Sequence, residues 1–102
     1  MSRHENDSVP RRTIRFFADW GADSPLWENG TDNYLMYPED LGLSGELATR
    51  LYGWAEFWCS HHQWETGWDA PASEEWSRKE GDELVAWLRR EVASFADVSD
   101  ER

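Results

Sequence analysis

The clearest structural signal in the sequence is Ser44-Gly45-Glu46-Leu47-Ala48-Thr49-Arg50-Leu51-Tyr52-Gly53-Trp54-Ala55-Glu56-Phe57-Trp58. Apolar side chains recur within it at the spacing of one helix face, which predicts an amphipathic helix; they are Leu47, Leu51, Trp54 and Trp58. Ser44 is a favourable N-cap, and Glu46 stands in the first turn, where the helix dipole favours a negative charge. We expect this helix to span residues 44–62, with Glu46 and Arg50 paired one turn apart.

A second helix is predicted over residues 73–95, beginning at Ser73 with acidic residues in its first turn. Its apolar face is formed by Leu84, Leu88, Val92 and Phe95. Ion pairs one turn apart are expected between Glu74 and Arg78 and between Glu75 and Lys79. Gly81 lies inside the helix at a cost of about 1 kcal/mol relative to alanine, so we expect another element to approach closely there.

The segment before these helices predicts a strand at residues 13–18, because it is β-branched and aromatic. Ile14 and Phe16 would share one face, and Thr13, Arg15 and Phe17 the other. Residues 19–31 contain Gly21, Pro25 and Asn29-Gly30 and are expected to form a loop. Residues 34–37 are a short strand candidate that could pair with the first strand. After Phe95 the chain could add an edge strand through Val98 or fray.

These elements predict an α+β fold in which a short N-terminal strand or two-stranded ribbon packs on two amphipathic helices. The length of 102 residues allows one core. We expect a flexible leader at 1–11, a single compact domain at 12–98 and a disordered tail at 99–102. Cys59 is the only cysteine, and the N-terminus lacks an apolar signal segment, so a reducing, cytoplasmic location is expected.

Charge is unevenly distributed along the chain. The whole sequence holds 21 Asp and Glu against 10 Lys and Arg, a net charge of -11. Residues 16–77 hold twelve of the acids, one base (Arg50) and seven of the eight tryptophans. Such a chain would repel nucleic acid and anionic membranes, so neither is expected as a partner. The asymmetry favours an acidic surface for a basic partner, with a merely solubilising surface as the alternative.

The tryptophans divide by their predicted position. Trp54, Trp58 and Trp87 lie on or beside helix faces and are expected in the core. Trp20, Trp27, Trp64 and Trp68 fall in predicted loops, where an indole beside acids suits a cationic group. The alternative is that they close the core beneath the loops. The candidate binding residues are Trp20, Trp27, Glu39, Asp40, Trp64 and Trp68.

The motifs for chemistry are weak. Cys59-Ser60-His61-His62, with Glu56 and Glu65 nearby, could place two metal ligands on one helix face, but a zinc site needs three or four. Cys59 lacks the electropositive setting of a reactive thiolate. The acid pairs Asp19/Asp23, Glu39/Asp40 and Glu74/Glu75 are expected by chance in so acidic a chain. We therefore expect no catalytic residue, metal or cofactor.

Several short blocks carry a resemblance to a known group of proteins; they are Phe17-Ala18-Asp19-Trp20-Gly21, Pro25-Leu26-Trp27, Pro38-Glu39-Asp40-Leu41-Gly42-Leu43-Ser44 and the helix from Glu46-Leu47 to Trp54. Through them the sequence resembles a group of small acidic bacterial proteins over residues 13–92. The resemblance implies a single compact domain and carries no activity. Cys59 to His62 and the basic leader lie outside the pattern.

The sequence as a whole favours a non-enzymatic acidic binding protein that engages a basic protein and can neutralise it, as immunity proteins, antitoxins and enzyme inhibitors do. One alternative is a small-molecule or amine-binding protein that uses loop tryptophans and acids. Another is a metal-dependent enzyme.

Overall fold

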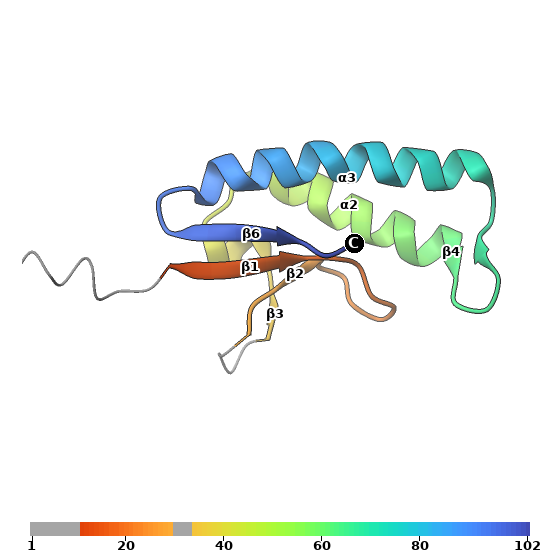
Figure 1. Cartoon of the computed structure of the whole chain (residues 1–102), viewed down its shortest axis with the longest axis horizontal. Helices are drawn as coiled ribbons and strands as arrows, with labels where there is room; N and C mark the ends of the chain where they lie inside the picture. The colour runs from red at the N-terminus through yellow and green to blue at the C-terminus, as the bar shows by residue number, and fades with distance from the viewer. Residues whose placement is uncertain (1–10, 30–33) are drawn as a thin grey trace, which may run out of the picture.

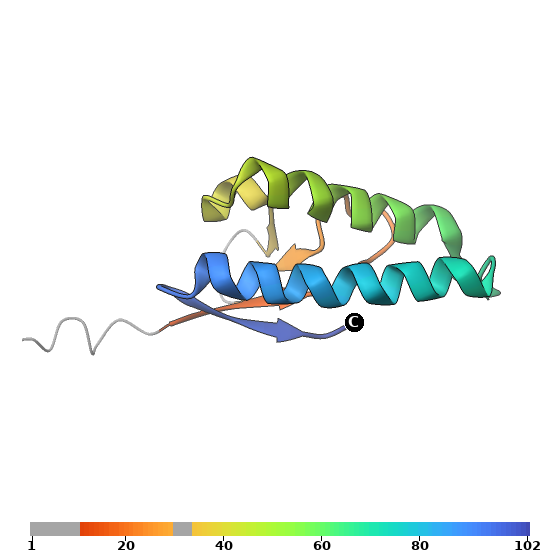
Figure 2. The ribbon, with the colours of Figure 1, turned by 90° about the horizontal axis from the view of Figure 1, so that it is seen from above.

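Two long helices lie side by side on one face of a small sheet, as both views of the computed structural model show (Figures 1 and 2). The structure describes residues 11–29 and 34–102. The helices are α2 (Gly45–His61) and α3 (Pro71–Val92), preceded by the 3-10 turn η1 (Pro38–Leu41). The α+β class predicted from the sequence is confirmed. The leader expected at 1–11 lies outside the described residues except for Arg11, as do Gly30 and Thr31 of the expected loop.

The main sheet has four strands in the order β3-β2-β1-β6. The strands of this sheet are β1 (Arg12–Phe16), β2 (Leu26–Trp27), β3 (Leu35–Met36) and β6 (Ala96–Asp100). A separate hairpin pairs β4 (His62–Gln63) with β5 (Gly67–Trp68). The pairs β1–β2 and β2–β3 are antiparallel, whereas β6 runs parallel to β1, with Ile14 opposite Val98. The expected pairing of residues 34–37 with the first strand is wrong, because β2 lies between them.

The core lies between the sheet and the two helices. Ile14 and Phe16 are fully buried on the helix side of β1, as the alternation predicted, and the Phe16 ring lies 4.7 Å from that of Trp54. The helices contribute the apolar faces that the sequence predicted; the buried residues are Leu47, Leu51, Trp54, Leu84, Leu88 and Val92. Within the described part of the chain, no helix is both long and apolar enough to cross a membrane.

The helix ends follow local chemistry. The Ser44 side chain accepts a hydrogen bond from the Leu47 amide at 3.3 Å, which confirms the predicted cap of α2. The Glu91 carboxylate in turn accepts hydrogen bonds from the Ser44 amide at 2.8 Å and hydroxyl at 2.6 Å, so the start of α2 is tied to the end of α3. α3 begins at Pro71, two residues before the predicted start, because proline is well suited to the first helical turn.

The predicted ion pairs are only partly formed. Lys79 pairs with Glu75 at 3.1 Å as expected. Arg50 instead turns away from Glu46 toward α3, where its guanidinium donates hydrogen bonds to Glu80 at 2.8 and 2.6 Å and to Glu83 at 3.0 Å. A bidentate, half-buried carboxylate holds arginine more strongly than an exposed pair one turn apart.

Arg78 also differs from the expectation, because its guanidinium forms an ion pair with the carboxylate of Asp82 at 4.0 Å and not with Glu74.

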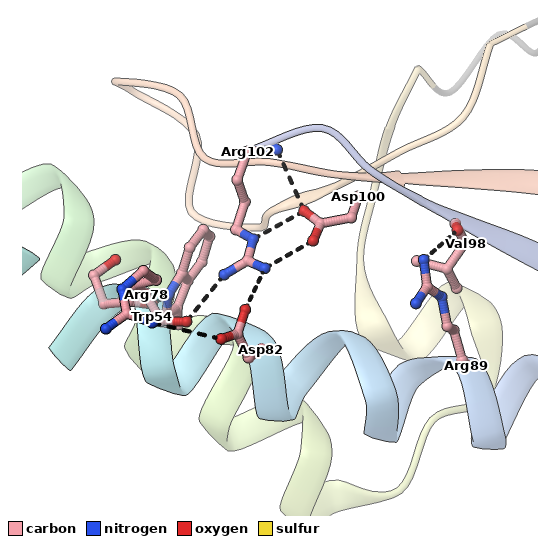
Figure 3. A network of polar contacts seen from close by, with 8 residues as sticks. Trp54, Arg78, Asp82, Arg89, Val98, Asp100 and Arg102 are labelled. Atoms are coloured by element: carbon pink, nitrogen blue, oxygen red, sulfur yellow. Dashed lines mark hydrogen bonds and ion pairs between the residues drawn. The ribbon is translucent and has the colours of Figure 1, made fainter. Parts of the chain in front are cut away.

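The end of the sequence is ordered against α3 (Figure 3). Residues 99–102 were expected to be a disordered tail, but β6 continues through Asp100. The Arg102 guanidinium donates hydrogen bonds to Asp82 and Asp100, each at 2.7 Å, and to the Arg78 carbonyl at 3.1 Å. A Cβ atom on Gly81 would collide with this guanidinium, which confirms the predicted close approach at Gly81.

Candidate functional site

Apart from Asp69, which pairs with His61, and Glu91, which binds Ser44 and Trp87, the described carboxylates fall into two groups. Eight form ion pairs with arginine or lysine: Glu28, Glu75, Glu80, Asp82, Glu83, Asp97, Asp100 and Glu101. Eight more are exposed, and no arginine or lysine of residues 11–29 and 34–102 lies within 4.0 Å of them: Asp19, Asp23, Glu39, Asp40, Glu46, Glu56, Glu65 and Glu74. The unpaired acids all precede Glu75, whereas the paired ones lie mainly on α3 and β6.

Five unpaired acids gather along the side of α2 that turns away from α3. We call this surface the acidic face; it consists of Asp19, Asp23, Glu39, Asp40 and Glu56. A shallow depression of about 400 Å³ at its centre is lined by residues that include Asp23, Tyr52 and Glu56. The Tyr52 hydroxyl donates a hydrogen bond to Glu39 at 2.7 Å, so η1 joins the same surface.

Two tyrosines report the negative charge at the acidic face. The carboxylate of Asp23 raises the pKa of Tyr37, and the charge of Asp40 adds to the effect. Burial raises the pKa of Tyr52, helped by its hydrogen bond to Glu39 and by the charge of Asp23. The phenolate of Tyr37 is disfavoured chiefly because it would add a negative charge beside existing ones, and that of Tyr52 chiefly because it would be buried, with the nearby carboxylates adding to the effect. The site residues predicted at 39 and 40 therefore lie in a region of concentrated negative charge.

The tryptophans separate by what their indole N–H groups bind. Four donate hydrogen bonds inside the chain: Trp20 to the His62 carbonyl, Trp27 to the Phe17 carbonyl, Trp54 to the Ser77 carbonyl and Trp87 to Glu91. The other four, Trp58, Trp64, Trp68 and Trp76, make no indole hydrogen bond within the described residues. Because a buried indole N–H usually has a partner, the first group is typical of architecture and the second of surfaces that meet something else.

The four tryptophans predicted to bind a partner differ in their exposure and ring contacts. Trp20 is 44% exposed, and its ring lies 4.5 Å from Trp58 and 5.3 Å from His62. Trp68 contacts the same His62 ring edge-on at 5.0 Å. Trp64 is 74% exposed in the turn between β4 and β5.

Trp27 does not join them. It is buried, stacks on Phe17 at 4.7 Å and donates its N–H to the Phe17 carbonyl at 2.9 Å. The sequence placed Trp27 in a loop, whereas it belongs to β2, and that strand packs the ring against its neighbour. Trp27 therefore supports the sheet and is not available on the surface.

Two tryptophans were missed as candidates. Trp58 follows the apolar period of α2 and was expected in the core, but it is only half-buried because it lies in the last turn, beyond the edge of the sheet. Trp76 is 43% exposed near the start of α3, where it packs on Phe57 at 4.3 Å. Trp76 lies two four-residue steps before Leu84, on the spacing shared by Leu84, Leu88 and Val92, so the apolar period gave no signal that it is exposed.

Cys59, His61 and His62 do not converge. The Cys59 thiol lies 3.6 Å from the Asp19 carbonyl, and His61 pairs with Asp69 at 2.7 Å, which lowers the pKa of Asp69. His62 stacks on Trp58 at 4.7 Å. In the described part of the chain, no three His, Cys, Asp or Glu side chains are grouped as metal ligands would be.

Comparison with known proteins places this architecture in a family. No curated protein matches the chain. The family described as Serratia CdiI immunity protein-like matches residues 12–99, which cover most of the sequence and nearly all the described elements. The match confirms the prediction of an immunity-type protein, whose partner is another protein. The chain therefore belongs to the Serratia CdiI immunity protein-like family.

Proposed function

We propose that the chain binds a protein toxin and neutralises it, and that the toxin presents a basic surface to the acidic face. Family membership supports the immunity role. The observation that carries the basic partner is the separation of charge, since five of the eight unpaired carboxylates gather beside α2, while most of those on α3 and β6 are paired with arginine or lysine.

Internal pairing decides which side of the molecule projects a field. An arginine–carboxylate pair is nearly neutral at a distance, so α3 and β6 contribute little despite their many charges. The acidic face has no such compensation among the described residues, and at physiological salt its field extends about 8 Å into solvent. An acidic face of this kind steers a basic protein into a defined orientation and speeds association.

The same carboxylates suit a particular way of blocking a toxin. A toxin that acts on a phosphate-bearing substrate has basic side chains at its active site. Asp19, Asp23 and Glu56 are exposed and can occupy the places of phosphates there. Such binding would cover the toxin's active site without any chemistry by this chain.

Co-expression tests the proposal. Each protein encoded beside this chain is produced in cells with and without it, and growth is followed. We expect one neighbour to arrest growth alone and to be harmless with this chain, and the purified pair to associate more slowly as salt rises. Toxicity that this chain never relieves would overturn the immunity role, and a salt-independent association rate would overturn the basic partner.

A further inference from the structure

We infer that the toxin's main short-range contacts are made at one end of the molecule, where a groove lined by tryptophans holds an arginine or lysine side chain of the toxin. This end, which we call the hairpin end, comprises the β4–β5 hairpin, the last turn of α2 and the first turns of α3 (Figure 1). The inference rests on the proposed function and adds the place and the chemistry of the contact.

The four tryptophans without an indole hydrogen bond all lie at the hairpin end. They are Trp58 in the last turn of α2, Trp64 and Trp68 in the hairpin, and Trp76 near the start of α3. Clustered exposed aromatic rings are typical of interaction sites, and an N–H group that has no partner within the chain can donate to a binding partner. Tryptophan is also the side chain most enriched where binding energy concentrates.

A groove of about 550 Å³ opens between two of these tryptophans, Trp58 and Trp68, and the end of β6. Its apolar lining includes Phe17 after β1, Trp54 and Trp58 of α2, and Trp68 of β5, so three separate segments of the chain form it. Ring faces attract a cation that loses its water, and Trp attracts it most strongly. The groove is thus best suited to the flat, weakly hydrated guanidinium of arginine. The ammonium of lysine is the second-best occupant.

The charged lining, counted with the residues that pair with it, carries one more negative than positive charge: Glu74, Asp82, Asp100 and Glu101 against Arg15, Arg78 and Arg102. Glu74, Asp100 and Glu101 face the groove against Arg78 and Arg102. The Arg102 charge is already matched by Asp82 and Asp100, and that of Arg15 by Glu101. Glu74 has no arginine or lysine within 4.0 Å among the described residues and is left to meet an incoming cation.

The chain's own Arg102 illustrates how this region holds a guanidinium (Figure 3). Its central carbon lies 5.8 Å from the centre of the Phe16 ring, and its N–H groups bind Asp82, Asp100 and a helix carbonyl. A partner arginine in the groove would find the same combination of an aromatic face and a carboxylate, supplied by Trp58 or Trp68 and by Glu74.

The hairpin end is continuous with the acidic face. Trp20 belongs to the loop that carries Asp19 and Asp23, and its ring lies 4.5 Å from Trp58, which lines the groove. The two surfaces therefore form one continuous interface with two roles. The acidic face attracts and orients the toxin, and the groove fixes it through close contact.

The first test uses N-acetyl-arginine amide as a probe and records the indole N–H signals of the eight tryptophans by NMR. We expect the signals of Trp58 and Trp68 to shift with increasing probe, while those of Trp27 and Trp87 stay in place. N-acetyl-glutamine amide serves as the uncharged control and should shift none of them. No shift at Trp58 and Trp68, or equal shifts with both probes, would overturn the groove's assignment.

The second test uses the toxin identified by co-expression and measures its dissociation constant. Trp64→Ala removes an exposed ring that the fold does not need, and Trp68→Phe keeps a ring but loses the N–H; we expect each to weaken binding at least about tenfold. Trp87→Phe, far along α3 from the hairpin, is the matched control and should change binding less than about twofold.

If the toxin binds the natural chain and both hairpin variants equally, the inferred contact at the hairpin end is wrong, while the immunity role stands. If no toxin binds the natural chain, the proposed function itself fails.

Discussion

At the scale of single residues, the Arg12–Glu28 pair shows how an ion pair stabilises a carboxylate buried at the sheet. The Arg12 guanidinium donates hydrogen bonds to both Glu28 oxygens at 2.8 and 2.7 Å, and Glu28 is buried. These hydrogen bonds hold the pKa of Glu28 below its ordinary value of 4.5, despite burial, which acts in the opposite direction. The ionised pair therefore stabilises the fold above about pH 4.5, and this contribution is lost as pH falls through the folded pKa.

Glu28→Gln tests that pair. At pH 7 we expect the variant to lose about 1–3 kcal/mol of unfolding free energy, because the amide cannot replace a charged bidentate partner. As pH falls below 4.5 the difference should shrink, because the natural chain then loses the stabilisation of its ionised pair. Urea unfolding over a series of pH values from neutral into acid measures the difference. A difference that stays constant over the series would contradict the role of the charge.

Gly81 and Gly53 form a second residue-scale comparison, because both lie inside helices but have different surroundings. A Cβ at Gly53 meets no atom within 4 Å, whereas one at Gly81 collides with the Arg102 guanidinium. Gly53→Ala should raise the unfolding free energy by about 0.5–1 kcal/mol. Gly81→Ala should give no such gain, because Arg102 must leave Asp82 and Asp100.

The double variant Gly81→Ala, Arg102→Ala supplies the control. Relative to Arg102→Ala alone, the added alanine should regain the helix benefit of about 0.5–1 kcal/mol. Urea midpoints compare the set. A Gly81→Ala variant as stabilised as Gly53→Ala would show that Arg102 moves aside without loss.

At the scale of elements, the helices were predictable from local signals and the sheet was not. α2 carries a periodic apolar face and a capping serine within one short segment, so its bounds followed directly. β2 has only two residues, Leu26 and Trp27, between a proline and a turn, and it exists because β1 and β3 flank it. The parallel pairing of β6 with β1 joins residues more than 80 positions apart, which no local pattern reports.

The junction of α2 with the end of α3 provides an element-scale prediction. Ser44→Ala removes the cap of α2 and the hydroxyl that binds Glu91, so the unfolding free energy should fall by about 1 kcal/mol. Thr49→Ala, one turn into the same helix, removes only a hydroxyl bound to the Gly45 carbonyl and should be neutral or slightly stabilising. Thermal unfolding of both variants measures this, and equal losses would contradict the capping role.

At the scale of the whole molecule, charge pairing distinguishes a side with unpaired carboxylates from a side with paired ones. The sequence shows only that acidic residues are unevenly distributed along the chain. The sequence located twelve acids between residues 16 and 77, yet it could not show which acids are neutralised. That depends on tertiary contacts such as Arg50 with Glu80, thirty residues away. For the same reason the sequence could not show that Trp27 is buried in the sheet or that Trp58 is only half-buried.

The measurement that tests the central claim most directly is the association rate constant of the toxin with two charge-matched variants. One neutralises three carboxylates of the acidic face (Asp23→Asn, Glu39→Gln, Glu56→Gln). The other neutralises three exposed carboxylates that already pair with arginine or lysine (Glu75→Gln, Glu83→Gln, Asp97→Asn). Each set removes three negative charges, so net charge alone affects both equally.

We predict that at low salt the first variant associates at least about tenfold more slowly than the natural chain, while the second stays within about twofold. Equal slowing in both variants would contradict the account, because the toxin would then respond to total charge and not to the acidic face.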